Sequence, residues 1–319
     1  MRAIGRLTAA LAVALLCAPG TWLRSPVEPA LLPDITATLI VDAAPTPVAQ
    51  WELAGVWQYR GESSHFGGFS AMFALEQGRF MAFTDRGYRM TFTAPDLPAP
   101  RMAMIRQAVP PGQEYILTDI ESATHDPATG SYWLGYEQVH TIQRSTIAGR
   151  SDGVRDLRDA VRWPDNAGAE AMVRLADGRF VIVPEGRREG LIFTTDPIGG
   201  GAPATFRFRS PAQGYVATDM AQLPDGRLLV LMRKLARPSR TVWPPFSALL
   251  AIGEVPQAGD KFAPAITLPL DRVIPRENYE GLALRPRRDG RVDVWVMSDD
   301  NFSIIQRSLL AKLVFDPQI

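Results

Sequence analysis

The sequence predicts an all-β fold, a β-propeller of five or six four-stranded blades. Three observations support this prediction: an internal repeat, a glycine turn at the same place in each repeat, and no convincing amphipathic helix between the predicted strands. A repeat of about 40 to 50 residues is typical of one propeller blade, which is built from four short strands and their turns. A doubly wound α/β fold would require helices of ten or so residues between the strands, and is the weaker alternative.

The repeat is present in five segments, which begin at Gly67, Asp119, Gly168, Ala217 and Tyr279. Each segment has a small or acidic start, a short apolar run, a turn containing glycine and a second apolar run. This is the pattern of a β-hairpin. Three of the turns read Asp-Gly-Arg, at 177–179, 225–227 and 289–291. Glycine supplies the positive φ that such turns require.

The five hairpins predict the outer strands and the closure of the ring. Segments between hairpins, such as 190–208 and 246–270, are expected to form outer strands, and a strand over about 50–61 is expected to complete the blade begun at the C-terminus. The equivalent positions Ser70, Glu121, Glu170, Asp219 and Glu280 are separated by 51, 49, 49 and 61 residues. The long last interval leaves room for a sixth blade. The charged stretch 152–162 is interpreted as a loop with a helical turn.

Composition excludes several classes of function. The chain has 34 basic and 34 acidic residues, so no overall field attracts it to nucleic acid. Its only cysteine, Cys17, lies in the N-terminal apolar run, which excludes disulfides, a cysteine-bound zinc and a cysteine nucleophile in the mature domain. No glycine-rich phosphate loop or dinucleotide-binding fingerprint is present.

The N-terminal segment indicates export. Residues 1–20 have two arginines followed by an apolar stretch that is short for a membrane span, as expected of a signal peptide or an uncleaved N-terminal anchor. We therefore expect a periplasmic or secreted protein that contacts a membrane only through such an anchor. Residues 21–47 are interpreted as a Pro-rich linker or extended arm, and 48–319 as one propeller domain.

Most repeats have an acidic residue where the first strand of the hairpin starts and another where the second strand ends. The first strand starts with the five equivalent positions above, and the second ends at Asp85, Glu137, Glu185, Arg233 and Asp299. In an antiparallel hairpin these two positions are neighbours, so all ten are expected at one end of the central channel. Like charges at such distances repel unless a cation or a basic side chain compensates them. The alternative for any single acid is a structural role, such as capping a turn.

The same segments resemble a known family, the bacterial phytase-like proteins described as having an esterase-like activity of phytase. The resemblance is carried by Phe-Gly-Gly-Phe-Ser at 66–70, Thr-Asp-Arg-Gly at 84–87, Asp-Ile-Glu-Ser at 119–122, Asn-Ala-Gly-Ala-Glu at 166–170, Asn-Tyr-Glu-Gly-Leu at 278–282 and Ser-Asp-Asp-Asn-Phe at 298–302. It implies a propeller-like domain in which several Glu and Asp residues carry an esterase or phosphoesterase activity.

The resemblance and the repeat together give a set of site residues. The acidic positions carried over from the family are Asp85, Glu121, Glu170, Glu280, Asp299 and Asp300. We expect catalytic roles for Glu121, Glu170, Glu280 and Asp85, substrate binding by Arg86, Arg233 and His65, and metal binding by Glu137, Glu185, Asp219, Asp299 and Asp300. The ring is asymmetric, because Ser70 and Arg233 replace acids in the first and fourth repeats.

These residues predict an exported hydrolase for a small-molecule ester. Carboxylates prefer hard cations, so Ca²⁺ is the expected cofactor, with metal-assisted hydrolysis of a phosphate or carboxylic ester as the expected reaction. Arginines beside the carboxylates would neutralise phosphoryl oxygens. Two alternatives stay open: a non-enzymatic propeller that binds calcium or another ligand, and a lactonase-type propeller that uses one central Ca²⁺.

Overall fold

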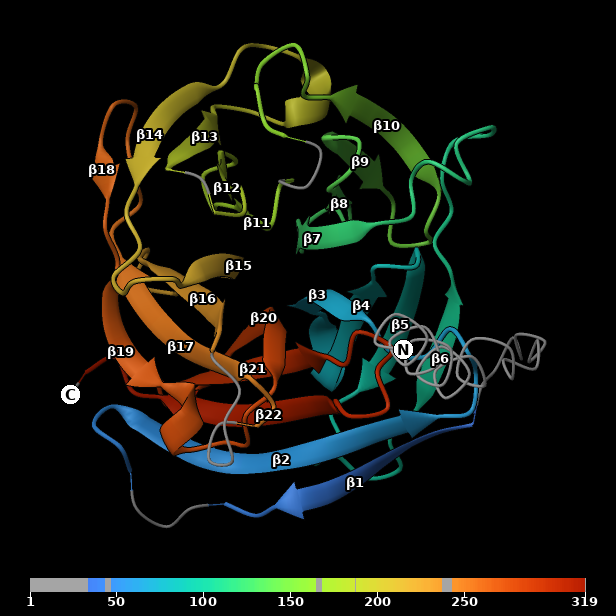
Figure 1. Ribbon diagram of the computed structural model, residues 1–319, viewed down its shortest axis with the longest axis vertical. Helices are drawn as coiled ribbons and strands as arrows, with labels where there is room; N and C mark the ends of the chain where they lie inside the picture. Colours follow the sequence, from blue (N-terminus) through green and yellow to red (C-terminus); the bar gives the residue numbers. More distant parts are fainter. Residues whose placement is uncertain (1–33, 44–46, 165–167, 187, 237–242, 319) are drawn as a thin grey trace, which may run out of the picture.

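The protein is a ring of five small β-sheets around a central axis (Figure 1). The structure, a computed structural model, describes residues 34–43, 47–164, 168–186, 188–236 and 243–318. The predicted signal segment 1–20 and Cys17 lie outside the described residues. Within the described part, five blades are present, which confirms the predicted propeller and decides between five and six.

Blades 1 and 2 are four-stranded antiparallel sheets formed by consecutive strands. Blade 1 contains β3 (Phe69–Ala74), β4 (Arg79–Thr84), β5 (Tyr88–Thr93) and β6 (Met102–Arg106), with a 3-10 turn, η1 (Glu76–Gly78), between β3 and β4. Blade 2 contains β7 (Ile120–His125), β8 (Tyr132–Tyr136), β9 (Thr141–Ser145) and β10 (Ser151–Asp156). The expectation of a loop with a helical turn over 152–162 was wrong for the first half of that stretch, which belongs to strand β10 and pairs with β9.

Blade 3 gains an edge strand from the part of the chain that forms blade 4. Blade 3 contains β11 (Ala171–Arg174), β12 (Phe180–Val183), β13 (Glu189–Phe193) and β14 (Ala204–Phe208), with η2 (Pro197–Gly199) between the last two. Blade 4 contains β15 (Val216–Gln222), β16 (Leu228–Leu235), β17 (Phe246–Gly253) and β19 (Ala265–Pro269), followed by η3 (Leu270–Arg272). The short strand β18 (Lys261–Phe262) leaves blade 4 and pairs in parallel with β14. The predicted outer strands are therefore present in both blades.

Blade 5 closes the ring by joining the two ends of the chain. It contains β20 (Asn278–Pro286), β21 (Val292–Asp299) and β22 (Ser308–Phe315), and then β2 (Trp51–Gly61) and β1 (Ile35–Val41). Strand β2 pairs antiparallel with β22, from Trp51 opposite Phe315 to Tyr59 opposite Ser308. The expected closing strand is thus present. Strand β1 lies within the segment 21–47 interpreted as a linker or arm, and forms the outer edge of this blade.

Apolar layers between neighbouring sheets hold the blades together. Between blades 5 and 1, Trp295 packs against Phe80 with ring centroids 5.1 Å apart, and between blades 2 and 3 Trp133 contacts Phe180 at 4.9 Å. A fully buried side chain of this size contributes about 1.5 to 3 kcal/mol, so each layer of ten or more such side chains fixes the relation of two blades. This rigidity positions the inner strands.

The Asp-Gly-Arg turns form the hairpins at the end of the ring away from the carboxylates. In the β11–β12 turn, Gly178 has φ of +89° and its N–H donates to Leu175 O. Asp177 accepts hydrogen bonds from the backbone N–H and the guanidinium of Arg179. Gly226 and Gly290 have the same positive φ. The sequence therefore sets the register of three inner hairpins locally.

Four of the five inner strands start with a β-bulge. The pairing shifts by one residue between Phe69 and Ala71, Ile120 and Ser122, Ala217 and Asp219, and Tyr279 and Gly281. The bulge residues are Ser70, Glu121, Thr218 and Glu280. A bulge inserts an extra residue and re-aims its side chain. In the fourth blade the position equivalent to Glu280 is therefore Thr218, one residue before the Asp219 expected from the repeat.

Candidate active site

Carboxylates converge where the inner strands begin and the second strands end. Hydrogen bonds between the two chain segments fix this meeting point, because Glu137 N–H donates to Asp119 O at 3.2 Å and Asp85 N–H donates to Gly68 O at 3.0 Å. In blades 1 and 2 the start of the first inner strand thus lies beside the end of the second, as expected of an antiparallel hairpin.

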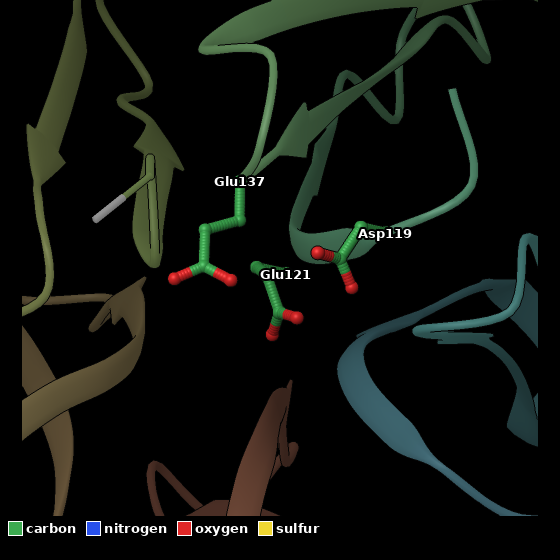
Figure 2. Close-up of side chains that lie close together, drawn as sticks. All are labelled: Asp119, Glu121 and Glu137. Atoms are coloured by element: carbon green, nitrogen blue, oxygen red, sulfur yellow. The ribbon is translucent and has the colours of Figure 1, made fainter. Parts of the chain in front are cut away.

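The first carboxylate group comes from blade 2. Asp119 and Glu121 lie two residues apart at the start of β7, and Glu137 follows β8 (Figure 2). One oxygen from each of the three lies within 4.8 Å of the others. Asp119 also forms side-chain hydrogen bonds with Glu121 and Gln138. All three are only partly buried, so solvent or a ligand can reach them.

The second carboxylate group shares Glu137 and extends into blade 3. It adds Glu170, which precedes β11, and Glu185, which follows β12, again with one oxygen from each within 4.8 Å. Glycine at 168 allows this approach, because a Cβ there would lie 2.4 Å from the Glu137 Cα. We call Asp119, Glu121, Glu137, Glu170 and Glu185 together the carboxylate centre.

Burial and mutual repulsion raise the pKa values in the carboxylate centre. Burial raises the pKa of Glu121 well above its usual value, and the charges of Glu170 and Glu280 add to the effect. The pKa of Glu170 is raised in the same way by burial and by Glu185 and Glu137. Burial, with repulsion from Asp119 and Glu185, raises the pKa of Glu137 to about 7. The basic side chains of the protein therefore neutralise only part of the negative charge that these carboxylates would carry.

Arg233 is the basic group that compensates part of this charge. Its Nε lies 2.8 Å from Glu280 Oε1 and its Nη2 lies 3.6 Å from Glu185 Oε1. Burial lowers the pKa of Arg233, but these carboxylates outweigh burial and raise it overall. The Nδ2 of Asn278 donates to Glu280 at 2.9 Å and to Asp299 at 3.3 Å. Arg233 thus fixes Glu280 beside the carboxylate centre.

Asp85 lies on the blade 1 side of the centre and has an unsatisfied oxygen. Its Oδ1 is buried and has no hydrogen-bond partner among the described residues. Burial, followed by repulsion from Asp119, raises the pKa of Asp85 to about 7. A buried acceptor without a partner costs about 1 to 3 kcal/mol. A buried acceptor without a partner favours the protonated carboxyl, in agreement with the raised pKa of Asp85.

Asp299 and Asp300 hold the loop that follows β21. Asp299 Oδ1 accepts from Asn301 N–H at 2.6 Å, and burial raises its pKa well above the usual value. Asp300 Oδ1 accepts from Gly68 N–H at 2.9 Å and Oδ2 accepts from Ser308 at 2.8 Å. Both Asp300 oxygens are engaged in the protein, so its expected role as a metal ligand receives no support from the geometry.

The two other predicted substrate-binding residues lie on the blade 1 side of the channel end. The Arg86 guanidinium lies 3.4 Å from the Phe302 ring centroid and donates to Ser64 O. The His65 ring stacks on Tyr88 with centroids 4.3 Å apart. Burial and the nearby Arg86 lower the pKa of His65 below its usual value. Gly68, with φ of +64°, allows Phe302 to pack close beside Asp85.

Asp219 lies apart from the carboxylate centre. Its side chain is buried, and it accepts backbone hydrogen bonds from Met220 at 2.8 Å, from Leu282 at 2.7 Å and from Met72. These donors belong to blades 4, 5 and 1. Asp219 therefore joins three inner strands, and these backbone donors engage its oxygens, so that it belongs to neither carboxylate group. Ser70 is also buried and donates to Ile120 O.

Two residues of the site were quoted in sequence motifs but received no role. Asp119 completes the first carboxylate group, and Asn278 connects Glu280 with Asp299. The spacing of Asp119 and Glu121 was the available indication, because residues two apart on a strand share a face. Asn278 is separated from Glu280 in the same way.

The carboxylate centre fits a hard divalent cation. Five carboxylates supply oxygen ligands only, and no cysteine or histidine belongs to either group in the described part of the chain. Ca²⁺ binds six to eight oxygens, typically from carboxylates, carbonyls and water. Burial and mutual repulsion raise the pKa values of these carboxyl groups. A bound cation would offset the repulsion and so favour the ionised carboxylates.

Two solved structures of other proteins are similar to this chain at low sequence identity. A luciferin-regenerating enzyme is 12% identical with a TM-score of 0.47, over 90% of this chain and 96% of that one. The β-propeller domain of Cps50 (Swd1) from Myceliophteria thermophila is 10% identical with a TM-score of 0.43, over 89% of this chain and 99% of that one. No curated protein matches the chain.

A family model gives the identification. The phytase-like family, described as "Esterase-like activity of phytase", matches residues 64–302. This range contains the whole carboxylate centre together with Asp85, Arg233 and Glu280. Because the match covers more than half of the sequence, the protein belongs to the phytase-like family.

Proposed function

We propose that this protein is an exported hydrolase that cleaves a phosphate or carboxylic ester at the carboxylate centre with the help of a divalent cation such as Ca²⁺. The observation that carries the proposal is the pair of oxygen groups sharing Glu137, each within 4.8 Å. Family membership supports an esterase-like chemistry. The apolar, arginine-led segment 1–20 supports export.

We assign the residues of the site to cation binding, to orientation of Glu280 and to charge stabilisation. Asp119, Glu121, Glu137, Glu170 and Glu185 would hold the cation. When bound, such a cation lowers the pKa of water and polarises an ester oxygen. Arg233 keeps Glu280 oriented beside this centre, at 2.8 Å. Arg233 and Arg86 supply positive charge for the oxygens of the reacting group.

Proton transfer is best assigned to Asp85. Its pKa is raised to about 7 and its Oδ1 has no partner in the described structure. A group with a pKa near the working pH can hold a proton or accept one without a large energetic cost. The Asp85 carboxyl, which is partly open to solvent, can therefore give a proton to the leaving oxygen or take one from water.

A calcium-binding propeller without catalysis is the second candidate. The observation in its favour is that Glu170 and Glu280 are each only 6% exposed, as in structural ion sites. In that case calcium would raise the melting temperature and the mutations below would change stability alone. A lactonase-type reaction is the third candidate, and hydrolysis of lactones in place of phosphate esters would identify it.

The test is an assay of the purified mature protein on p-nitrophenyl phosphate, phytate, p-nitrophenyl acetate and a lactone, with calcium and with chelator. We expect turnover of a phosphate or carboxylic ester that chelation abolishes. Glu121→Gln removes one ligand charge and should reduce kcat/KM about 100-fold or more. Glu76→Gln, on an exposed turn, is the matched control and should retain full activity.

Two results would contradict the proposal. One is the absence of turnover on all four substrates while calcium still binds, which selects the binding propeller. The other is full activity in chelator, or in Glu121→Gln, which places catalysis elsewhere.

A further inference from the structure

The most exposed large apolar side chains all lie at the end of the propeller where the carboxylate centre lies, which we call the carboxylate end. Six large apolar side chains are more than half exposed among the described residues: Tyr115, Ile116, Leu235, Trp243, Ile304 and Ile305. Other exposed ones, such as Leu97 and Ile147, are less than half exposed. Single exposed apolar residues are common on protein surfaces, but six at one end of a molecule indicate a contact surface.

Three loops next to the candidate site carry these side chains. The β6–β7 loop carries the first two and leads directly into Asp119, and the β21–β22 loop carries the two isoleucines 304 and 305 and starts at Asp300. Leu235 is the last residue of β16, two residues after Arg233, and Trp243 lies shortly before β17. The loops leave blades 1, 5 and 4, which Figure 1 shows at different positions around the ring. The apolar side chains therefore form three groups at one end of the molecule.

Two of these loops have a backbone that is held in place beside the exposed side chains. In the β6–β7 loop, the Arg106 guanidinium donates to Glu114 O at 2.9 Å, and Leu117 is buried. In the β21–β22 loop, Asn301 Nδ2 donates to Gln306 Oε1 at 2.9 Å, across the segment that carries the two isoleucines. The apolar side chains are therefore presented to solvent from defined positions.

The chain also enters the described structure at the carboxylate end. Ile35, the first residue of β1, pairs with Gly61, the last residue of β2. The next segment, 62–68, leads to Gly68, whose N–H donates to Asp300 of the β21–β22 loop. The described part of the chain contains no helix that is long and apolar enough to cross a membrane. The apolar segment 1–20 precedes a strand that begins at this end, so an uncleaved anchor would hold the carboxylate end toward the membrane.

The exposed side chains are of the types that bind the surface of a lipid bilayer. Trp and Tyr favour the headgroup region because their rings are amphipathic, and Ile and Leu gain free energy by burial among acyl chains. A protein partner would require one contiguous apolar core. Here the three apolar groups are on different blades, and charged residues such as Asp119 and Arg233 lie at the same end. This distribution favours a lipid surface, which each loop can enter separately.

We propose that the carboxylate end of the propeller docks on a lipid surface through these three apolar groups. The contact goes beyond the N-terminal anchor expected from the sequence and does not require it. It is also independent of the proposed function, because docking needs neither a bound cation nor hydrolysis. Apolar side chains drive the binding, so it persists on zwitterionic lipid and at high salt concentration.

Sedimentation with phosphatidylcholine vesicles, in chelator, tests the proposal on the protein without residues 1–20, which retains all five blades. We expect binding that increases with lipid concentration and is unchanged at about 0.5 M salt, which screens charge interactions. Ile304→Ser/Ile305→Ser should lower the partition coefficient roughly tenfold or more. Leu97→Ser/Ile147→Ser, in loops at the opposite end, is the matched control and should bind as the wild type does.

Two further measurements test the other loops. Tyr115→Ser/Ile116→Ser should weaken binding by a factor similar to that of the isoleucine variant. Vesicles with bromine-labelled acyl chains quench the fluorescence of tryptophans that enter the bilayer. We expect such quenching in the wild type and a clear reduction of it in Trp243→Phe, because Trp243 is exposed at this end.

Four results would overturn the proposal. The first is no sedimentation with vesicles, and the second is equal binding by the wild type and both loop variants. The third is binding that salt abolishes, because it would be electrostatic adsorption. The fourth is a dimer in equilibrium sedimentation that Ile304→Ser/Ile305→Ser dissociates, without vesicle binding, which would assign these loops to a contact between two copies of the chain.

Discussion

Glu170 and Asp177 lie at the two ends of one short strand, β11, and meet opposite conditions. At the channel end, burial and neighbouring carboxylates raise the pKa of Glu170. At the turn end, the hydrogen bond from Arg179 lowers the pKa of the solvent-exposed Asp177. Each Asp-Gly-Arg turn supplies its own counter-charge two residues away, whereas the channel end gathers acids from several blades around one main arginine. A carboxylate therefore has its counter-charge beside it at the turn end, whereas at the channel end it has mainly other carboxylates as neighbours.

Asp219 provides the strictest test of this comparison, because it is buried yet serves structure. Asp219→Asn keeps the shape but places an NH₂ group against a backbone N–H donor. We expect a loss of about 3 kcal/mol in the free energy of unfolding. Urea denaturation measures it. Thr218→Val, which removes only hydroxyl contacts of 3.4 Å, should cost less than half as much. A loss of calcium binding in Asp219→Asn at retained stability would place Asp219 in the site instead.

The pH dependence of stability in chelator should report the channel end. The pKa values of Asp85 and Glu137 are about 7 in the folded protein, against 3.8 and 4.5 for unperturbed groups. The folded state therefore binds more protons between about pH 4 and pH 7, and its stability falls as the pH rises through this window. Because both side chains are partly open to solvent, we expect a fall on the order of 1 to 2 kcal/mol.

Urea denaturation of the wild type and of Asp85→Asn/Glu137→Gln isolates this effect. The double variant should lose most of the slope, and calcium should reduce the slope in the wild type because the cation replaces protons. Stability that rises with pH in chelator across the same window would contradict the assignment of these raised pKa values.

The smallest effect is expected at the turn end. Asp177→Asn removes the charge paired with Arg179 but keeps an acceptor for the backbone N–H. An exposed pair of this kind contributes about 0.5 kcal/mol or less. Urea denaturation should show this small loss, with calcium binding and activity unaffected. A loss near that of Asp219→Asn would show that the two ends are less different than the structure indicates.

The fold could be predicted because its determinants are local and repeated. The Asp-Gly-Arg turns fix the inner hairpins, and the run 51–61 completes the last blade beside β22, where the ring has to close. The site was harder, because the bulges break the two-residue alternation. In blade 4, Thr218 and Asp219 are both polar, and the pairing shift between Ala217 and Asp219 makes Thr218 the extra residue of the bulge.

Tertiary contacts decide the remaining roles. The chain shows an acid at 300, but only the folded structure shows that Gly68 and Ser308 already occupy its oxygens. The cavity of about 830 Å³ between blades 3 and 4 likewise joins residues from 188, 207–209 and 261, which no single motif contains. The spacing of residues in the sequence indicates which side chains are neighbours on one strand. It does not indicate which residues of different strands line a common cavity.

The pairing of Trp51 with Phe315 has a consequence for how the molecule is made. Strand β2 emerges from the ribosome before the four blades that follow it, whereas its partner β22 is synthesised after all of them. Those four blades can condense one after another, but the fifth keeps an exposed hydrogen-bonding edge until β22 has been made. Such a long-range contact slows the final folding step and makes it vulnerable to truncation at either end.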